Sequence, residues 1–299
     1  MQNRRELLRA VFEDTQRFYS EDPVLSESAA KSRENTRLYG SDDYPALPAD
    51  EDLKKQREIC VTRERTFEAA VRLHRQYPDR KIAVLNFASA VNPGGGVKHG
   101  ASAQEEALCR CSTLYPTLDC KWLREQFYDV NRSAGDVRHT DALIYSPDIV
   151  ICKTDDAIPQ RLDPQDFVSV DVISCAAPNL RNEPANWRNP ETGKPVRMDS
   201  GQLYALHVRR ARHILHIAAY NKADILVLGA FGCGAFANDP QTVASAYQTV
   251  CADYRKWFDV IDFAVYCRDY ETENYDSFLR ELSLKNSPAG ITGQENTDA

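Results

Sequence analysis

The sequence lacks any run of about 18 apolar residues, which excludes a membrane-spanning helix of ordinary length. It also lacks the apolar segment of a signal peptide, because residues 1–20 combine charged and apolar side chains as an amphipathic helix does. The nine cysteines form no CxxC pair and do not show the even framework of a small secreted domain. These absences predict a cytoplasmic protein without membrane contact, whose thiols are reduced and mostly buried.

Basic side chains are in the minority, since 37 Lys and Arg stand against 44 Asp and Glu and give a formal net charge of −7. Binding of DNA or RNA over a broad surface draws its affinity from many cationic contacts to phosphate, so this balance argues against it. An anionic ligand would have to be held locally. Backbone amides in glycine-rich loops can do this without net positive charge.

The common patterns of metal and nucleophile sites are also missing. The six histidines show no HExxH spacing, and no GxSxG elbow occurs. His213 and His216 share a predicted helix with several arginines, and we expect them on a solvated or rim face. Cys109 and Cys111 are only a weak alternative as nucleophiles. The sequence therefore predicts neither a metal nor a cofactor.

Short runs rich in β-branched residues alternate with helical segments along most of the chain, which is typical of an α/β fold. The predicted strands are residues 59–61, 81–87, 149–152, 167–175, 225–228 and 260–266. The predicted helices are residues 2–19, 66–77, 104–114, 203–220 and 242–258.

No internal repeat or low-complexity linker interrupts this alternation, so residues 57–285 are predicted to form one domain. Residues 1–56 are expected to be an N-terminal helix followed by a polar arm that wraps the domain. Residues 181–198 are polar and without periodicity, and we expect them to run over the surface. Residues 286–299 are expected to be a disordered tail.

A Pro-Gly-Gly-Gly loop, residues 93–96, follows the predicted strand 81–87. A tight turn needs one glycine and seldom three, because each glycine costs backbone entropy. Gly94, Gly95 and Gly96 would let backbone amides approach a diphosphate closely. On these residues alone, a purely structural turn is an equally good interpretation.

Glu105 and Glu106 occupy the first turn of the next helix, where the helix dipole favours negative charge. Ser102 lies three residues before Glu105, so a capping box is the simple structural interpretation. Only seven residues separate the glycine loop from the segment Gln-Glu-Glu, and both acids would then face whatever the loop holds. Successive helical residues point about 100° apart, so one acid should position substrate and the other should transfer the proton.

A second glycine-rich loop, residues 229–238, again lies between a strand and a helix. It is neither a Rossmann fingerprint nor a P-loop, because the acid of the first and the GK[ST] of the second are absent. Two such loops on one sheet predict two walls around a phosphate-bearing ligand at the carboxyl edge. Phe236 could stack on a base or ribose, and a core position is about equally well supported.

The run NPGGG followed after seven residues by QEE resembles the signature of poly(ADP-ribose) glycohydrolases, in particular of their bacterial, microbial-type branch. The segments SCAAPN, residues 174–179, and GAFGCGAFAND, residues 229–239, resemble the corresponding strand ends of that branch. The resemblance implies an α/β, macrodomain-like three-layer sandwich, with a mixed central sheet flanked by helices and an N-terminal helical extension.

Residue by residue, the resemblance implies that Glu106 is the catalytic acid/base and that Glu105 fixes a ribose hydroxyl of the scissile unit. Asn92 would hold the distal ribose, and the two glycine-rich loops would enclose the diphosphate. Tyr266 and Tyr270 are candidates for stacking on adenine. The implied substrate-binding residues are Asn92, Gly94, Gly95, Gly96, Gln104, Gly232, Cys233, Gly234, Ala235 and Phe236.

The implied activity is exo-type hydrolysis of ribose–ribose O-glycosidic bonds in poly(ADP-ribose), with ADP-ribose as the product. Such cleavage needs a proton on the leaving oxygen, stabilisation of an oxocarbenium-like centre and then an activated water. Two alternatives would use the same site: removal of a single ADP-ribose from protein or nucleic acid, and binding of ADP-ribose without cleavage. The presence of both acids disfavours pure binding, which does not need Glu106.

Overall fold

A seven-stranded mixed sheet lies at the centre of the described part of the computed structural model, which comprises residues 3–47, 58–185 and 193–283. The strand order is β1-β4-β5-β3-β6-β7-β2; β4 is antiparallel to both of its neighbours, and the other pairs are parallel. The strands are β1 (Arg37–Tyr39), β2 (Glu58–Thr62), β3 (Ile82–Phe87), β4 (Leu143–Ile151), β5 (Val168–Cys175), β6 (Ile225–Leu228) and β7 (Val260–Ala264).

Helices precede, connect and follow these strands. The helices are α1 (Arg4–Glu21), α2 (Pro23–Asn35), α3 (Thr66–Gln76), α4 (Gln104–Cys111), α5 (Leu114–Leu118), α6 (Lys121–Leu123), α7 (Asp129–Ala134), α8 (Ser200–Tyr220), α9 (Pro240–Tyr254) and α10 (Glu273–Ser283). Short 3-10 or π-helical turns are η2 (Val97–His99), η3 (Arg124–Tyr128), η4 (Pro164–Asp166) and η5 (Arg255–Trp257).

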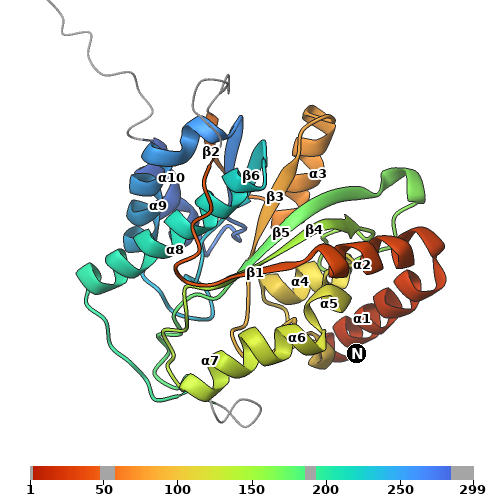
Figure 1. Ribbon diagram of the computed structural model, residues 1–299, viewed down its shortest axis with the longest axis horizontal. Coiled ribbons are helices and arrows are strands. Elements are labelled where there is room, and N and C mark those ends of the chain that lie inside the picture. The colour runs from red at the N-terminus through yellow and green to blue at the C-terminus, as the bar shows by residue number, and fades with distance from the viewer. Residues whose placement is uncertain (1–2, 48–57, 186–192, 284–299) are drawn as a thin grey trace, which may run out of the picture.

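Each face of the sheet has its own apolar core, because successive strand residues point to opposite faces. In β3, Ala83 and Leu85 belong to the core beneath α8, α9 and α10, whereas Ile82 and Val84 belong to the core shared with α1, α3, α4 and α5. Figure 1 shows these two groups of helices on opposite sides of the sheet. The α/β prediction is therefore confirmed at the level of a mixed sheet between helical layers.

The six predicted strands are all present, but β1 lies in the predicted arm and was missed. Among the predicted strands the largest difference is β4, which begins six residues before the predicted start at Ile149. Its register shifts between Ser146 and Ile149, and Asp148 has a φ of 55°. This irregularity removes the regular alternation on which the prediction depended.

The polar segment after α1 differs from the predicted arm, because residues 23–35 form helix α2. Asp22 is its N-cap and accepts from the backbone N–H groups of Val24 and Leu25, while Pro23 stands in its first turn. Leu25 is fully buried against Val150 of β4 and Cys152. The apolar face of α2 is too narrow for a periodicity argument to detect. The predicted tail, residues 286–299, lies outside the described residues.

His213 and His216 correct another expectation, because both are buried in α8 and do not lie on a solvated face. The Nε2 atom of His213 lies 3.1 Å from the carbonyl oxygen of Asp43, and that of His216 lies 2.7 Å from the carbonyl oxygen of Pro45. The two rings hold the segment after β1 against α8. The wrapping arm thus covers the histidines that the helix pattern placed at the surface.

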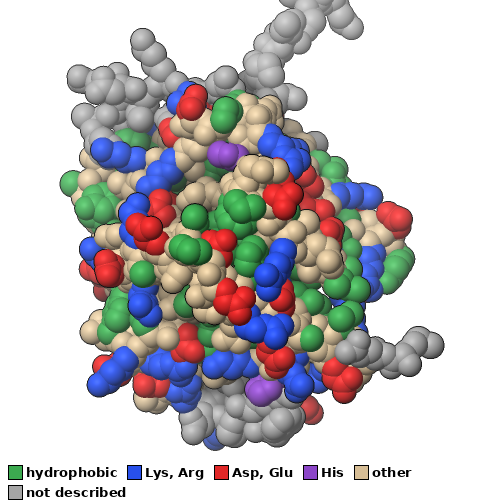
Figure 2. Space-filling model, turned by 90° about the vertical axis from the view of Figure 1, so that its right-hand side faces the viewer, with side chains coloured by type: hydrophobic (Ala, Val, Ile, Leu, Met, Phe, Trp, Pro, Cys, Tyr) green, Lys and Arg blue, Asp and Glu red, His purple; other side chains and the backbone are tan. Residues whose placement is uncertain are grey.

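No helix in the described ranges is long and apolar enough to cross a membrane. The nine cysteines are free thiols, and five of them are buried. Figure 2 shows basic and acidic side chains interspersed over the face that it displays. The cytoplasmic location stays a prediction.

Candidate active site

The carboxyl ends of the parallel strands meet at one edge of the sheet, and a cavity of about 1170 Å³ lies there. Segments that follow β3, β5, β6 and β7 all line it. Because β3 and β6 are hydrogen-bonded neighbours, the two glycine-rich loops leave adjacent strands and border the same cavity. The structure thus brings together the two walls that the sequence predicted.

The first glycine loop is shaped by helix α4, which packs directly against it. Gly94 and Gly95 have φ values of 66° and 57°, a left-handed conformation that favours glycine. A Cβ atom at Gly95 would lie 2.7 Å from Oε1 of Glu106 and 3.1 Å from Oε2 of Glu105. Gly94 is not among the residues that line the cavity, and a Cβ atom there would lie 2.8 Å from the ring of Tyr115. The glycines therefore let the loop touch both acids, besides any approach to a ligand.

Glu105 does not belong to a capping box, so that structural interpretation was wrong. The N-cap of α4 is Ala103, which makes no side-chain cap bond. The Glu105 carboxylate turns instead to the end of β3, where it accepts from the backbone N–H of Ser89 at 2.8 Å and from the side-chain amide of Asn86 at 3.3 Å. Burial, and then the negative charge of Glu106, hold the pKa of Glu105 well above its usual range.

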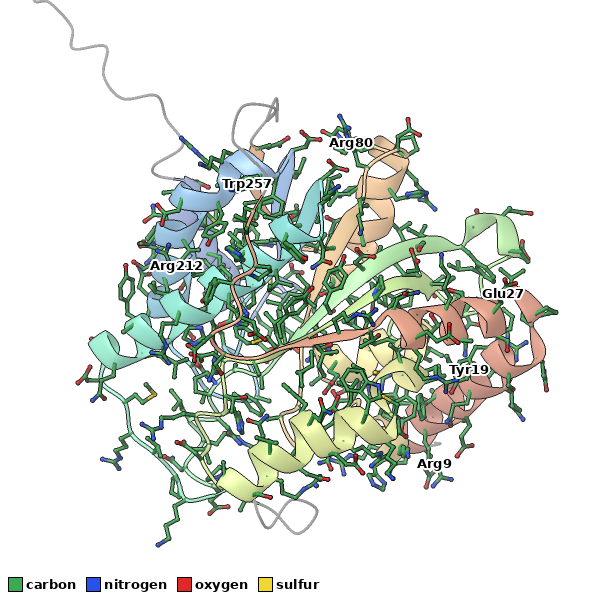
Figure 3. All side chains as sticks on the ribbon, in the orientation of Figure 1. Arg9, Tyr19, Glu27, Arg80, Arg212 and Trp257 are labelled. Atoms are coloured by element: carbon green, nitrogen blue, oxygen red, sulfur yellow. The ribbon has the colours of Figure 1, made fainter. Side chains whose placement is uncertain are left out.

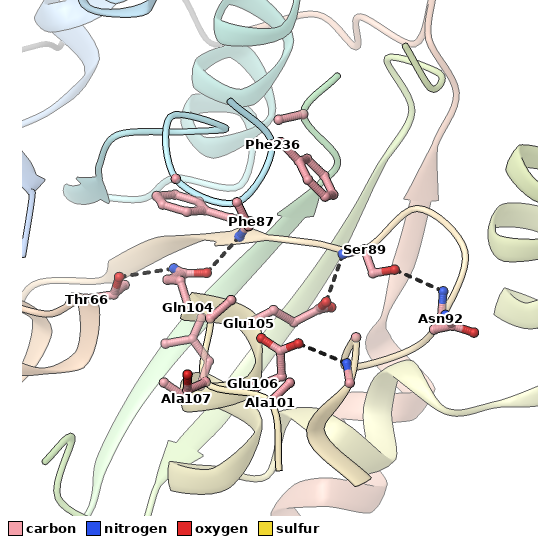
Figure 4. A pocket seen from close by; sticks show the side chains of 18 of the residues that line it. Thr66, Phe87, Ser89, Asn92, Ala101, Gln104, Glu105, Glu106, Ala107 and Phe236 are labelled. Atoms are coloured by element: carbon pink, nitrogen blue, oxygen red, sulfur yellow. Dashed lines mark hydrogen bonds between the residues drawn. The ribbon is translucent and has the colours of Figure 1, made fainter. Parts of the chain in front are cut away.

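Glu106 is also buried, at 8% exposure, and its two carboxylate oxygens differ. Oε1 accepts from the backbone N–H of Gly96 at 2.9 Å. Oε2 is buried and has no hydrogen-bond partner among the described residues, although Glu106 lines the cavity. Figure 4 shows the two carboxylates close together, with Glu105 bonded toward Ser89 and Glu106 toward the glycine loop. A buried acceptor without a partner inside a ligand-sized cavity is typical of a functional position.

Gln104 connects α4 to the end of β3 through two hydrogen bonds and to the start of α3 through a third. Its Oε1 accepts from the backbone N–H of Phe87 at 2.8 Å, and its Nε2 donates to the carbonyl of Leu85 at 2.8 Å and to Oγ1 of Thr66 at 3.0 Å. Gln104 lines the cavity, but these bonds engage both ends of its amide. These bonds fix the first residue of α4, and with it the positions of the two acids that follow.

The second glycine loop is folded around Asn238, a residue that the sequence analysis did not single out. The amide of Asn238 donates to the carbonyl oxygens of Pro178 and Gly232, and its Oδ1 lies 2.8 Å from Nε2 of His207. Gly232 has a φ of 81°, and a Cβ atom there would lie 2.9 Å from the Asn238 side chain. At Gly234, by contrast, a Cβ atom would meet nothing within 4 Å. The loop is therefore tightly folded at its base and open where it faces the cavity.

The remaining predicted residues of this wall occupy different positions. Ala235 and Phe236 line the cavity, whereas the side chain of Cys233 packs against the core beneath α8 and α9. The ring of Phe236 is partly buried, with the guanidinium of Arg181 5.9 Å from its centroid and the ring of His139 6.3 Å away. Asn92 also lines the cavity. Ser89, Arg181 and His139 were missed, because single polar residues in irregular segments carry no spacing signal.

Comparison with known proteins gives a consistent result. The family described as microbial-type PARG, catalytic domain, matches residues 10–154. The solved poly(ADP-ribose) glycohydrolase of Deinococcus radiodurans in complex with ADP-ribose is 36% identical, with a TM-score of 0.69, and the match covers 86% of this chain and 97% of that one. The chain belongs to the microbial-type PARG family.

Other members of the PARG family agree with this assignment. The solved poly(ADP-ribose) glycohydrolase of Thermomonospora curvata is 29% identical with a TM-score of 0.77, and the match covers 93% of this chain and all of that one. The same enzyme bound to the inhibitor ADP-HPD is 29% identical with a TM-score of 0.74, with coverage of 92% and 99%. A comparison with curated proteins finds no match.

Within this PARG-family cavity, the two tyrosines considered for adenine stacking separate. Tyr266 lines the cavity and is half exposed, with the guanidinium of Arg65 4.2 Å from its ring centroid. Tyr270 is 74% exposed and is not among the residues that line the cavity. Among the described residues, no group of three or more His, Cys, Asp or Glu side chains could hold a metal ion.

Proposed function

We propose that the cavity hydrolyses ribose–ribose O-glycosidic bonds of poly(ADP-ribose) and releases ADP-ribose, with Glu106 as the general acid/base. Membership of the PARG family supports the activity. The observation that supports the role of Glu106 is its buried Oε2, which has no protein partner in the described part of the chain and belongs to a cavity-lining side chain.

The proposed mechanism uses one carboxyl group twice. Protonated at Oε2, Glu106 donates its proton to the leaving oxygen as the bond from that oxygen to C1″ of the terminal unit breaks, and the bonding electrons remain on the oxygen. The cation left on the ribose is stabilised by the substrate's own diphosphate. Glu106, now a carboxylate, accepts a proton from the water that attacks C1″, which restores the acid. The bond from Gly96 N–H to Oε1 leaves Oε2 available for both transfers.

Glu105 is proposed to hold a ribose hydroxyl and to keep the first glycine loop in place. Its carboxylate accepts from Asn86 in β3 and from Ser89 in the segment that leads to the loop, so a shift of Glu105 would also move the residues that face the ribose. We propose that Gln104 acts beside it by positioning α4 through its bonds to β3. A positioning role fits an amide that is engaged by protein at both ends.

The substrate-binding roles follow from the two loops. We propose that Asn92 contacts the distal ribose, that the backbones of Gly95 and Gly96 and of residues 232–236 enclose the diphosphate, and that Phe236 and Tyr266 support the adenosine. We further propose exo action and a macrodomain-like description of residues 57–285 with residues 1–56 as an extension. Exo action predicts free ADP-ribose from the first turnovers, whereas internal cleavage predicts shortened oligomers.

The experiment that tests this function compares wild-type protein with the Glu106→Gln variant on poly(ADP-ribosyl)ated protein. We expect Glu106→Gln to lower hydrolysis roughly 100-fold or more, because the amide cannot supply the proton. Its ADP-ribose affinity should stay within roughly tenfold, or about 1.4 kcal/mol, because the amide oxygen still accepts from Gly96. Glu125→Gln, at an exposed acid that pairs with Lys121, is the matched control.

The two alternatives give different results in the same assay. Intact polymer together with release of ADP-ribose from singly modified protein would favour the single-unit hydrolase. Tight ADP-ribose binding without release from either substrate would favour the reader. Loss of ADP-ribose binding in folded Glu106→Gln protein would make Glu106 a ligand-positioning residue and contradict its role as the proton donor.

A further inference from the structure

The N-terminal helix α1 is part of the wall of the catalytic cavity. Arg4, Arg5 and Leu8 line the same cavity as Glu106. The helix is firmly docked there: Oγ1 of Thr15 donates to the carbonyl of Arg110 in α4 at 2.6 Å, and the ring of Phe12 packs edge-on against Tyr115 at 4.9 Å between centroids. The first turn of α1 is therefore held in a defined place beside the active site.

A short series of contacts connects this first turn to the catalytic carboxyl group. Oε1 of Glu106 accepts from the N–H of Gly96, and the carbonyl of Gly96 accepts from the N–H of Ala101 at 3.2 Å. The next residue back, Gly100, has a φ of 69°, and a Cβ atom there would collide with the carbonyl oxygen of Arg5. Only the loop of residues 96–101 thus separates Glu106 from the backbone of Arg5.

The side chains at this end of the cavity are mainly cationic, although the whole chain is acidic. Arg4 and Arg5 are exposed, and neither side chain forms an ion pair with a described residue. Lys98 and Arg124 also line the cavity and share one acid, Asp119, with Lys98 Nζ 3.5 Å from its Oδ2. We call Arg4, Arg5, Lys98 and Arg124 the cationic wall. Among the described residues, the four cationic side chains have only one acidic partner, Asp119, so the wall carries a net positive charge.

We propose that the cationic wall binds the diphosphate of the next ADP-ribose unit, the one that leaves when the terminal unit is cut off. This inference rests on the proposed function. The leaving oxygen is a 2′ oxygen of an adenosine whose 5′ carbon carries that diphosphate. When the leaving oxygen lies at Glu106, the attached nucleotide extends out of the catalytic site. The cationic wall lies along this path. Arginine suits such a contact, because its planar fork pairs with phosphate oxygens.

The wall would make the protein prefer polymer to a single modification. A single ADP-ribose on a protein side chain has no second diphosphate, and neither does the product ADP-ribose. Contacts to the leaving unit would thus strengthen binding of the polymer without strengthening binding of the product. The N-terminal helix would then be a determinant of substrate class in addition to packing against α4.

The test is the double variant Arg4→Ala/Arg5→Ala, assayed on poly(ADP-ribose) and on a nitrophenyl glycoside of ADP-ribose, whose leaving group has no diphosphate. We expect the ratio of kcat/KM for polymer to kcat/KM for the aryl glycoside to fall roughly tenfold, through a higher KM for polymer. The salt dependence of that KM should also weaken, because exposed charge contacts are screened. Arg4→Glu/Arg5→Glu should lower the ratio further.

The matched control is Arg9→Ala on the same helix. Arg9 lies on the outer surface of α1, outside the cavity lining, and pairs with Glu13 at 3.4 Å (Figure 3). It should keep the wild-type ratio, and circular dichroism should show the same helix content in all variants.

Three outcomes would overturn the inference. An unchanged ratio in Arg4→Ala/Arg5→Ala would show that the wall does not contact the leaving unit. An equal loss on both substrates would indicate damage to the catalytic site. A loss confined to an ADP-ribosylated oligonucleotide would assign the wall to a nucleic-acid backbone instead. Failure of wild-type protein to degrade polymer would refute the proposed function itself, and is seen before any variant is compared.

Discussion

Alanine substitutions in the two glycine loops should differ in their effect on stability, although both should impair function. In the second loop, Gly234→Ala adds a methyl group where nothing lies within 4 Å, and the φ of Gly234 is not in the left-handed region. We expect its free energy of unfolding to stay within about 0.5 kcal/mol of wild type. In the first loop, Gly95 has a φ of 57°, which costs a residue with a Cβ atom about 1–2 kcal/mol.

The two methyl groups also meet different neighbours. At Gly95 the new Cβ would lie 2.7 Å from Oε1 of Glu106, so the Glu106 carboxyl group must move. At Gly234 the methyl group would occupy the open side of the loop, at the cavity. If the diphosphate lies there, it loses the close approach that glycine allows, and we expect ADP-ribose affinity to fall roughly tenfold, or about 1.4 kcal/mol.

Two measurements separate these effects. Urea unfolding gives the stability of each variant, and titration calorimetry with ADP-ribose gives the affinity. Gly234→Ala should be as stable as wild type with weaker binding, and Gly95→Ala should be less stable and inactive. Wild-type affinity in Gly234→Ala would refute the assignment of the second loop to the diphosphate. Wild-type stability and activity in Gly95→Ala would refute the argument that the first loop needs glycine to contact Glu106.

Three further predictions concern buried polar groups. Burial raises the pKa of Asp155 to about 6 from 3.8, so the folded state holds this proton more tightly than the unfolded state does. The contribution of the protonated group to the free energy of unfolding is fully present below pH 3.8 and is lost as the pH rises through about 6. Between pH 4 and pH 7, wild-type protein should therefore lose about 2 kcal/mol of unfolding free energy from this group, and Asp155→Asn should not; parallel pH profiles would contradict this prediction. Arg210→Met should cost about 3–5 kcal/mol, because the fully buried guanidinium pairs with Asp141 at 2.7 Å and donates to the carbonyl of Ala176 at 2.7 Å, and both acceptors would lose this donor. Arg212→Met removes an exposed ion pair and should cost under about 1 kcal/mol, so equal costs in urea unfolding would be evidence against this reasoning. Cys109→Ala should keep polymer hydrolysis, because burial and the neighbouring carboxylates hold the thiol pKa well above its usual range, and an inactive but folded variant would revive the nucleophile alternative.

Local patterns in the sequence were enough to predict six of the seven described strands and the two loops that border the cavity, whereas the short edge strand β1 was missed. Short β-branched runs determine which segments enter a buried sheet, and the carboxyl ends of parallel strands meet at one edge wherever such a sheet forms. The signal for α2 was also present, as Asp22 at the N-cap and Pro23 in the first turn, but a narrow apolar face concealed it. The residues that resemble the PARG signature supplied the family.

Tertiary structure alone decided what each polar side chain does. Glu105 and Glu106 are neighbours in sequence with similar local surroundings, yet one carboxylate bonds to Ser89 and Asn86 while the other keeps a buried oxygen without a protein partner among the described residues. The same holds for α1, whose place beside the active site depends on the contact of Thr15 with Arg110, 95 residues later in the chain. Periodicity and spacing report only on neighbours along the chain, because a side chain's final partners are set by packing between segments that the sequence keeps far apart.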